Sequence, residues 1–146
     1  MTRIDWGAVA GLAASASAVF AGIQIRESRR SGLRQTSLGF LREIDERLAP
    51  IAAVKTETLR AEIIAYRREP GETLSVDAQQ YSAFLNALDR LSLAMAEGAL
   101  DPTIVRPWLR GVLEPKDVWI KFIEQLQDAI HDRSVLEYLQ RYLLQK

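Results

Sequence analysis

An uncharged stretch near the start of the chain constrains the fold more than any other feature. It runs from Trp6 to Ile25, and residues 26–34 directly after it contain four arginines. Twenty residues at about 1.5 Å per residue make a helix of roughly 30 Å, which is the thickness of the hydrocarbon core of a bilayer. We therefore predict that this stretch forms a membrane-spanning helix.

The composition of the stretch makes it a marginal membrane inserter, because glycine, serine and alanine fill most positions. Its strongly apolar residues contribute together about −2 to −3.5 kcal/mol to insertion. These residues are Val9, Leu12, Val19, Phe20, Ile23 and Ile25. A signal peptide is one alternative, since Ala16-Ser17-Ala18 has the form of a cleavage site, although the apolar run continues beyond it. A helix of a soluble protein, buried in its own core or in the core of an oligomer, is another.

Small residues recur along the stretch at intervals of four. One row begins with a G-x-x-x-G pair, and a second row combines three alanines with a glycine. Such rows let helices approach closely in lipid, where packing drives association. We therefore predict self-association through this face, although an alanine-rich helix also produces such spacings by chance. The predicted interface residues are Gly7, Gly11, Ala14, Ser15, Ala18 and Gly22.

The arginines after the stretch predict how the chain is oriented. Arg26, Arg29, Arg30 and Arg34 outnumber the single acidic residue of this segment, whereas residues 1–5 hold one arginine and one aspartate. Basic residues stay on the cytoplasmic side of a membrane, and each contributes about 1 kcal/mol of attraction to anionic headgroups. We expect these four arginines to contact lipid headgroups and the C-terminal part to be cytoplasmic.

The rest of the chain predicts helices throughout. Apolar residues recur at spacings of three and four, and no alternating segment or hairpin signal is evident. The predicted class is all-α, with residues 1–32 as transmembrane anchor and basic link and residues 33–146 as a cytosolic bundle of about five helices. The helical patterns cover residues 35–48, 51–68, 75–97, 102–113, about 115–131 and 134 onward.

Capping residues mark several of these boundaries. Ser75 or Asp77 can cap the helix that follows, and Gly98 suits a left-handed C-terminal cap. Asp101 followed by proline is typical of a helix start. The helix over residues 75–97 has the most regular apolar stripe, so we expect it at the centre of the bundle. Within it, Asn86 and Asp89 are predicted as hydrogen-bonding structural residues, with contact to a partner as the alternative.

The sequence does not indicate catalytic chemistry. The 19 basic residues balance the 19 acidic ones, which argues against a dedicated nucleic-acid-binding protein, and the chain has no cysteine. His131 is the one histidine, and it lies near a predicted helix end without the spacing of a metal motif. The Arg-His pair of HEPN-type helical ribonucleases is missing, as is any phosphate-binding glycine loop. We predict no cofactor, no metal site and no enzyme; catalysis would need a pocket that joins Asp89, His131 or tyrosines.

The segment from Phe84 to Asp101, read behind an N-terminal anchor, resembles a family of small uncharacterised bacterial proteins. In that family an LN-x-(L/F)-(D/E) helix precedes a glycine and a short helix that opens with aspartate, and this chain reads Leu85-Asn86-Ala87-Leu88-Asp89. The resemblance implies one transmembrane helix in the bacterial inner membrane and a cytosolic helical domain. The layout is also similar to the Cas13b-associated membrane accessory protein, which implies oligomeric assembly in antiviral defence.

Two functional hypotheses follow. The first is a non-enzymatic single-pass membrane protein that self-associates and acts through contacts with an unknown protein partner, as a membrane-perturbing or scaffolding component. The second is a soluble helical adaptor whose alanine-rich N-terminal helix forms an oligomer core. They differ in what covers residues 6–25, which is lipid in the first and protein in the second.

Overall fold

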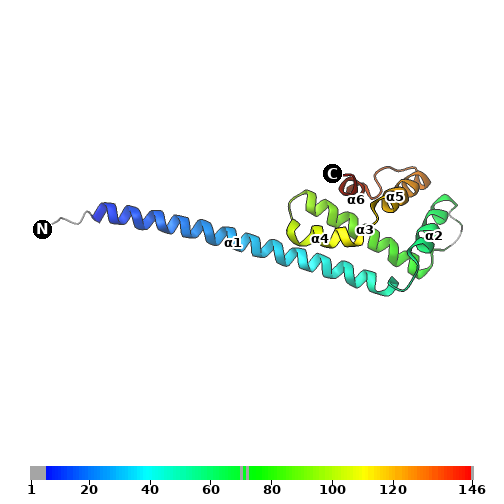
Figure 1. Cartoon of the computed structure of the whole chain (residues 1–146), viewed down its shortest axis with the longest axis horizontal. Coiled ribbons are helices and arrows are strands. Elements are labelled where there is room, and N and C mark those ends of the chain that lie inside the picture. The colour runs from blue at the N-terminus through cyan, green and yellow to red at the C-terminus, as the bar shows by residue number, and fades with distance from the viewer. Residues whose placement is uncertain (1–5, 70, 72, 146) are drawn as a thin grey trace.

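The longest element, α1, is one uninterrupted helix that both leaves the bundle and forms part of it (Figure 1). In the computed structural model the backbone is described for residues 6–69, 71 and 73–145, and side chains from residue 19 onward within those ranges. Helix α1 spans Trp6–Leu48, 43 residues and about 65 Å at 1.5 Å per residue. Gly32 lies inside it without a break, since one helical glycine costs only about 1 kcal/mol.

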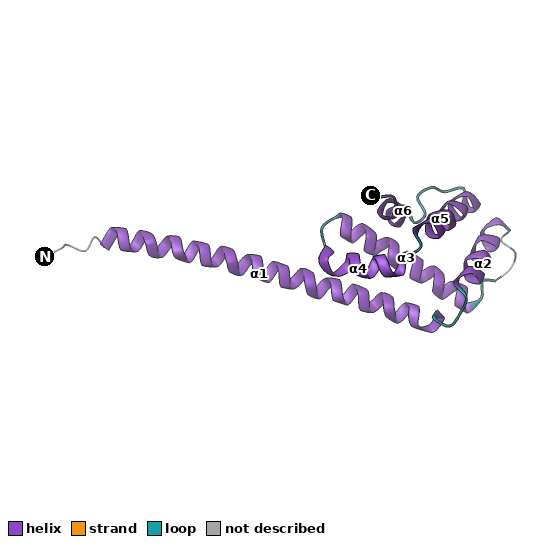
Figure 2. Cartoon of the chain, viewed as in Figure 1, coloured by secondary structure: helices purple, strands orange, loops and turns teal. Residues whose placement is uncertain are grey.

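The other helices form a small bundle against the C-terminal part of α1, and Figure 2 shows no strand in the described part of the chain. The all-α prediction is therefore confirmed. A 3-10 turn, η1, follows α1 at Pro50, where the missing N–H of proline ends the α-helical pattern. The remaining elements are η1 (Ala49–Ile51), α2 (Thr56–Arg68), α3 (Val76–Ala96), α4 (Pro102–Val112), α5 (Lys116–Ile130) and α6 (Glu137–Leu144).

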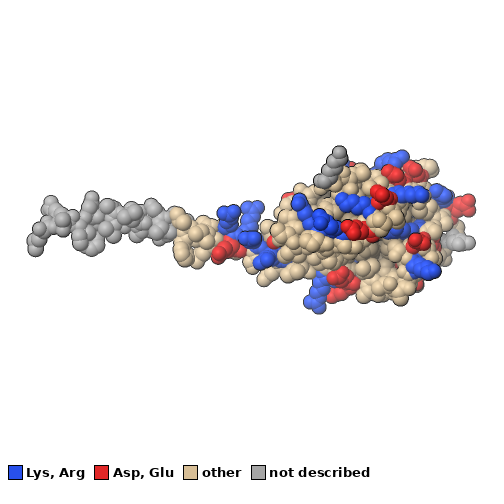
Figure 3. Space-filling view, in the orientation of Figure 1, with Lys and Arg blue, Asp and Glu red and all other residues tan. Residues whose placement is uncertain are grey.

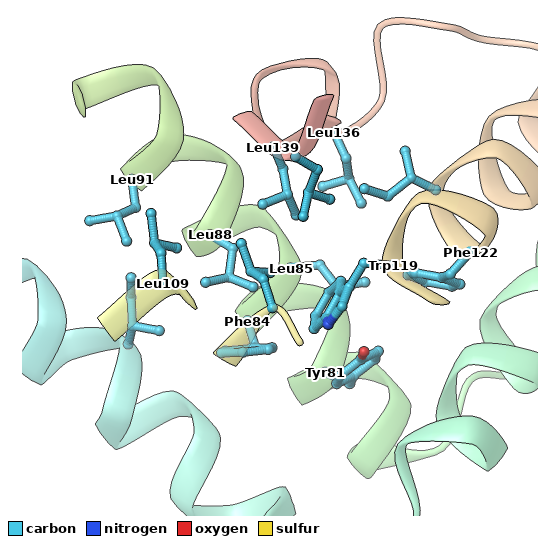
Figure 4. Packing of buried hydrophobic residues seen from close by; sticks show 14 of the residues in the cluster. Tyr81, Phe84, Leu85, Leu88, Leu91, Leu109, Trp119, Phe122, Leu136 and Leu139 are labelled. Atoms are coloured by element: carbon cyan, nitrogen blue, oxygen red, sulfur yellow. The ribbon is translucent and has the colours of Figure 1, made fainter. Parts of the chain in front are cut away.

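Helix α3 lies at the centre of the bundle, as its regular apolar stripe predicts. It packs against α1, η1, α2 and α6, while α2 also packs against α5, and α4 against α1. Leu88 and Leu91 of α3 are fully buried, and they meet Leu109 of α4 and Leu139 of α6 in one apolar cluster (Figure 4). This cluster joins all the elements, so α1 is held by the same core as the rest of the bundle.

The capping residues explain why α3 and α4 begin where they do. The Ser75 hydroxyl accepts a hydrogen bond from the Ala78 N–H at 3.1 Å, and the Asp101 carboxylate accepts one from the Thr103 N–H at 3.0 Å. Both satisfy donors that a helix start leaves free. Gly98, after α3, has φ +71°, in the left-handed region open to glycine. The three predicted caps are confirmed.

Two predicted helix starts are wrong. Helix α2 begins at Thr56 rather than residue 51, because the chain passes through η1 and a turn after Pro50. Helix α6 begins at Glu137 rather than Ser134, because Leu136 adopts a left-handed backbone (φ 55°) through which a right-handed helix cannot continue. In the turn before it, the Asp132 carboxylate accepts hydrogen bonds from the N–H and the hydroxyl of Ser134. Both segments carry apolar residues at helical spacing, and this pattern does not reveal that a turn replaces the first residues of each predicted helix.

Asp89 has the structural role predicted for it, whereas Asn86 is exposed. From α3, the Asp89 carboxylate accepts a hydrogen bond from the Leu139 N–H at 2.8 Å and so binds the start of α6. Burial raises the pKa of this carboxyl above its ordinary value, while hydrogen bonds from the Leu139 and Tyr138 N–H groups oppose the shift. The ionised form is therefore disfavoured in the fold.

We expect Asp89→Asn to be at least as stable as the wild type at pH 7. Because the pKa is raised on folding, the carboxyl favours the folded state fully below its unfolded pKa, and this contribution is lost as pH rises through the folded pKa. Asparagine keeps an acceptor for the Leu139 N–H without titrating. Urea unfolding of both chains at pH 7 and near pH 4 measures the difference, and the wild type should gain on the variant at the lower pH. A wild-type advantage that grows with pH would contradict this assignment.

Candidate functional site

The candidate site is the neck, residues 26–34, where α1 leaves the bundle. Arg26, Arg29, Arg30 and Arg34 are all exposed there, and Figure 3 shows basic side chains gathered at this junction. Arg26 and Arg30 share a helical stripe with the half-buried Leu33 and the fully buried Ser37, since successive spacings are four, three and four residues. The arginine side of the neck therefore continues into the side of α1 that packs on the bundle.

A buried hydrogen bond fixes the neck to the start of α4. The Ser37 hydroxyl donates to the Leu33 carbonyl at 2.7 Å and accepts from the Asp101 N–H at 2.8 Å. The Arg34 Nε lies 3.9 Å from the second carboxylate oxygen of Asp101. The Thr103 hydroxyl and N–H lower the pKa of Asp101 most, and Arg34 and Arg30 lower it further. Asp101 is therefore held as a carboxylate that joins α1 to α4.

Ser37→Ala is expected to lower the free energy of unfolding by about 1–3 kcal/mol, because the Asp101 N–H would stay buried without an acceptor. Urea unfolding followed by tryptophan fluorescence measures this loss. Thr36→Ala is the matched control, since the exposed Thr36 hydroxyl also donates to a carbonyl four residues back, at 2.9 Å, but has no described hydrogen bond to another helix. Equal losses in the two variants would contradict a special role for Ser37.

An open crevice of about 510 Å³ lies between the neck and the start of α4. It is lined by Arg26, Arg29, Arg30, Leu33, Asp101 and Pro102. Of the four neck arginines, Arg34 alone has a described carboxylate within 4.0 Å. The crevice thus combines three guanidinium groups that have no described ion-pair partner with an apolar wall.

The described end of the uncharged stretch is exposed on every side. Val19, Phe20 and Ile25 are 63%, 67% and 69% exposed, and at 100° per residue they point about 100–140° apart around the helix. A methyl group placed at Gly22 would meet no atom within 4 Å beyond the neighbouring residues and backbone of its own helix. The other predicted interface residues, Gly7, Gly11, Ala14, Ser15 and Ala18, lie outside the side chains that the structure describes.

Within the part of the chain that the structure describes, none of the helices has both the length and the apolar character needed to cross a membrane. That part leaves out the side chains of residues 6–18, which make up most of the predicted span. The transmembrane helix and the interface along it therefore remain predictions.

A second surface, which the sequence pattern does not reveal, is a groove of about 540 Å³ between α2 and α5. Its floor includes Ile64 and Phe122, and Arg60 and Lys121 are among its basic residues. The Arg60 guanidinium carbon lies 4.3 Å from the ring centre of Trp119 and 5.0 Å from that of Phe122. Its Nε donates to the Tyr81 hydroxyl at 2.9 Å. Arg60 therefore links α2, α3 and α5.

No described feature adds catalytic chemistry to these surfaces. His131 is exposed at the C-terminal end of α5, with a left-handed backbone (φ 59°). Among the described residues, no group of three or more histidine, aspartate or glutamate side chains is placed to hold a metal ion. Comparison with protein-family models, curated proteins and solved structures finds no match to this chain. The neck and the helix that leaves it are therefore the features that bear on function.

Proposed function

We propose that the chain is a single-pass membrane protein whose residues 6–25 cross the bilayer and hold the helical bundle at its cytoplasmic face. One observation carries the proposal: the uncharged stretch is the part of α1 that extends beyond the bundle (Figure 1), and the arginine neck begins at its end. A projecting helix with apolar side chains on all sides needs an apolar environment around its whole circumference. A bilayer supplies one over the length of about 30 Å that this stretch covers.

The neck supports the cytoplasmic orientation, because four exposed arginines follow the stretch directly. On this proposal the protein lies in the bacterial inner membrane, self-associates through the small-residue rows and acts through protein contacts of the bundle. A scaffolding or membrane-perturbing role in antiviral defence extends the proposal, and it is supported by the resemblance in layout.

The alternative is a soluble adaptor in which copies of residues 6–25 cover one another. The same exposed side chains favour it, since Val19, Phe20 and Ile25 would be buried equally well between helices. In this case the protein would be a water-soluble oligomer, and deletion of residues 6–25 would dissociate it.

A carbonate wash of membranes from cells that express the full chain tests the proposal. The decisive variant is Ser15→Asp, which places a charge in the middle of the stretch. A central charge costs about 2.5–3.5 kcal/mol, as much as the strongly apolar residues contribute together. Gln35→Asp is the matched control, because residue 35 is exposed on α1 beyond the neck.

We expect the full chain and Gln35→Asp to stay in the membrane pellet, and Ser15→Asp and the chain without residues 6–25 to be released. Release of the full chain would overturn the membrane proposal. A monodisperse water-soluble oligomer that needs residues 6–25 would then establish the adaptor.

A further inference from the structure

The crevice at the neck has the features of an anion site that is open to one side. Arg26, Arg29 and Arg30 face it without a described carboxylate within 4.0 Å, while Leu33 and Pro102 supply an apolar wall. Guanidinium groups present planar sets of N–H donors that match the oxygens of a phosphate. Three of them at one crevice can surround a single phosphoryl group.

Asp101 forms no described ion pair within 4.0 Å with these three arginines, although Arg30 lies near enough to lower its pKa. One of its carboxylate oxygens accepts from the N–H and the hydroxyl of Thr103, and the other faces Arg34. Arg34 is thus its counter-ion. Pro102 has no N–H to offer at the start of α4, and the Asp101 charge repels an anion there. A phosphate in the crevice would therefore lie on the neck side, against Arg26, Arg29 and Arg30.

The depth of these residues fits a lipid headgroup. If residue 25 marks the end of the hydrocarbon core, residues 26–30 extend about 1.5–7.5 Å beyond it along the helix axis. The headgroup region on one side of a bilayer is roughly 5–8 Å thick. Arg34, at about 13 Å, lies past that layer and binds the bundle instead. The arginines at headgroup depth are thus the ones without a described counter-ion.

We propose that this crevice binds the phosphodiester headgroup of an anionic phospholipid, with Arg26, Arg29 and Arg30 as ligands of the phosphate and with Leu33 and Pro102 on the side of the crevice away from the hydrocarbon core. This inference rests on the proposed membrane anchor. Pro102 of α4 borders the same crevice as the arginines of α1, so the bound lipid lies beside both helices. It fixes the α4 end of the bundle against the membrane surface and sets the orientation in which the bundle is displayed.

Native mass spectrometry of the full chain in neutral detergent tests the site. Phosphatidylglycerol, phosphatidylcholine and inorganic phosphate are added separately. The test variant replaces Arg26, Arg29 and Arg30 by glutamine, and the control replaces Arg90, Arg106 and Arg110, which are exposed arginines of α3 and α4. We expect one tightly bound phosphatidylglycerol, weakened at least tenfold in the test variant, since each basic residue near a membrane surface contributes on the order of fivefold. The control should bind like the wild type.

The site would be overturned if the test variant and the control variant bound phosphatidylglycerol equally well. It would also be overturned if the wild type bound phosphatidylcholine as tightly as phosphatidylglycerol. If inorganic phosphate bound as tightly as phosphatidylglycerol, the crevice would be a site for a soluble anion, and the lipid proposal would be wrong. The carbonate wash tests the membrane anchor independently of the lipid site. The test variant keeps residues 6–25, so it should stay in the membrane pellet. A pelleted chain without lipid preference refutes the crevice alone, whereas a released full chain refutes the anchor.

Discussion

Leu88→Ala is expected to lower the free energy of unfolding by about 2–5 kcal/mol, the usual range for a leucine removed from a packed core. Leu88 has no exposed surface, and it lies in the cluster that joins α3 to α4 and α6 (Figure 4). The lost transfer free energy and the cavity left behind add together. A domain of this size is stable by roughly 5–15 kcal/mol, so this one change removes a large share of the total.

The control for Leu88 is the same substitution at Leu38, on the part of α1 that packs on the bundle. Leu38 is 57% exposed, so Leu38→Ala should change the free energy of unfolding by less than about 0.5 kcal/mol. Urea unfolding followed by tryptophan fluorescence compares the two variants. The slope of the free energy of unfolding against urea concentration should be the same in both. A loss at Leu88 no greater than that at Leu38 would show that the α3 stripe is not the centre of the core.

Local chemistry predicted much of this fold from the sequence. Ser75, Gly98 and Asp101 each act on backbone groups within a few residues, so their roles follow from residue type and position. The stripe of α3 is similarly local, because helical spacing alone decides which side chains share a face. The same reasoning gave no sign of the left-handed backbone at Leu136, which has φ 55° although a branched side chain disfavours that region. Leu136 is buried in the core there, at 4% exposed.

The neck shows the limit of this reasoning for the candidate site. Its four arginines stand out in the sequence because they follow an uncharged stretch. One of them, Arg34, is ion-paired, and the other three face a crevice. This difference depends on Asp101, which is distant in the chain. Ser37 gave no signal at all, since its acceptor role depends on an N–H 64 residues away. Contacts between residues so far apart in the sequence come from tertiary packing, which neither composition nor periodicity reveals.

Arg60→Met is expected to lower the free energy of unfolding by about 2–4 kcal/mol. The change removes the cation–π contacts with Trp119 and Phe122, worth about 0.5–2 kcal/mol. It also deprives the Tyr81 hydroxyl of its donor, and an unpaired buried polar group costs about 1–3 kcal/mol. Tyr81 is 1% exposed, and burial raises its pKa above the ordinary value although Arg60 opposes the shift. Urea unfolding of Arg60→Met at pH 7 measures the loss.

A double-mutant cycle with Tyr81→Phe separates the hydrogen bond from packing. Phenylalanine keeps the ring, which lies 5.9 Å from the Phe84 ring centre and 6.5 Å from that of Phe122, but has no hydroxyl to satisfy. Methionine keeps much of the Arg60 stem over the aromatic rings. When both polar partners are removed no buried group is left unpaired, so Arg60→Met should cost less in the Tyr81→Phe background than alone. Equal costs in the two backgrounds would mean that Arg60 stabilises the junction of α2, α3 and α5 through the aromatic rings and not through the Tyr81 hydroxyl.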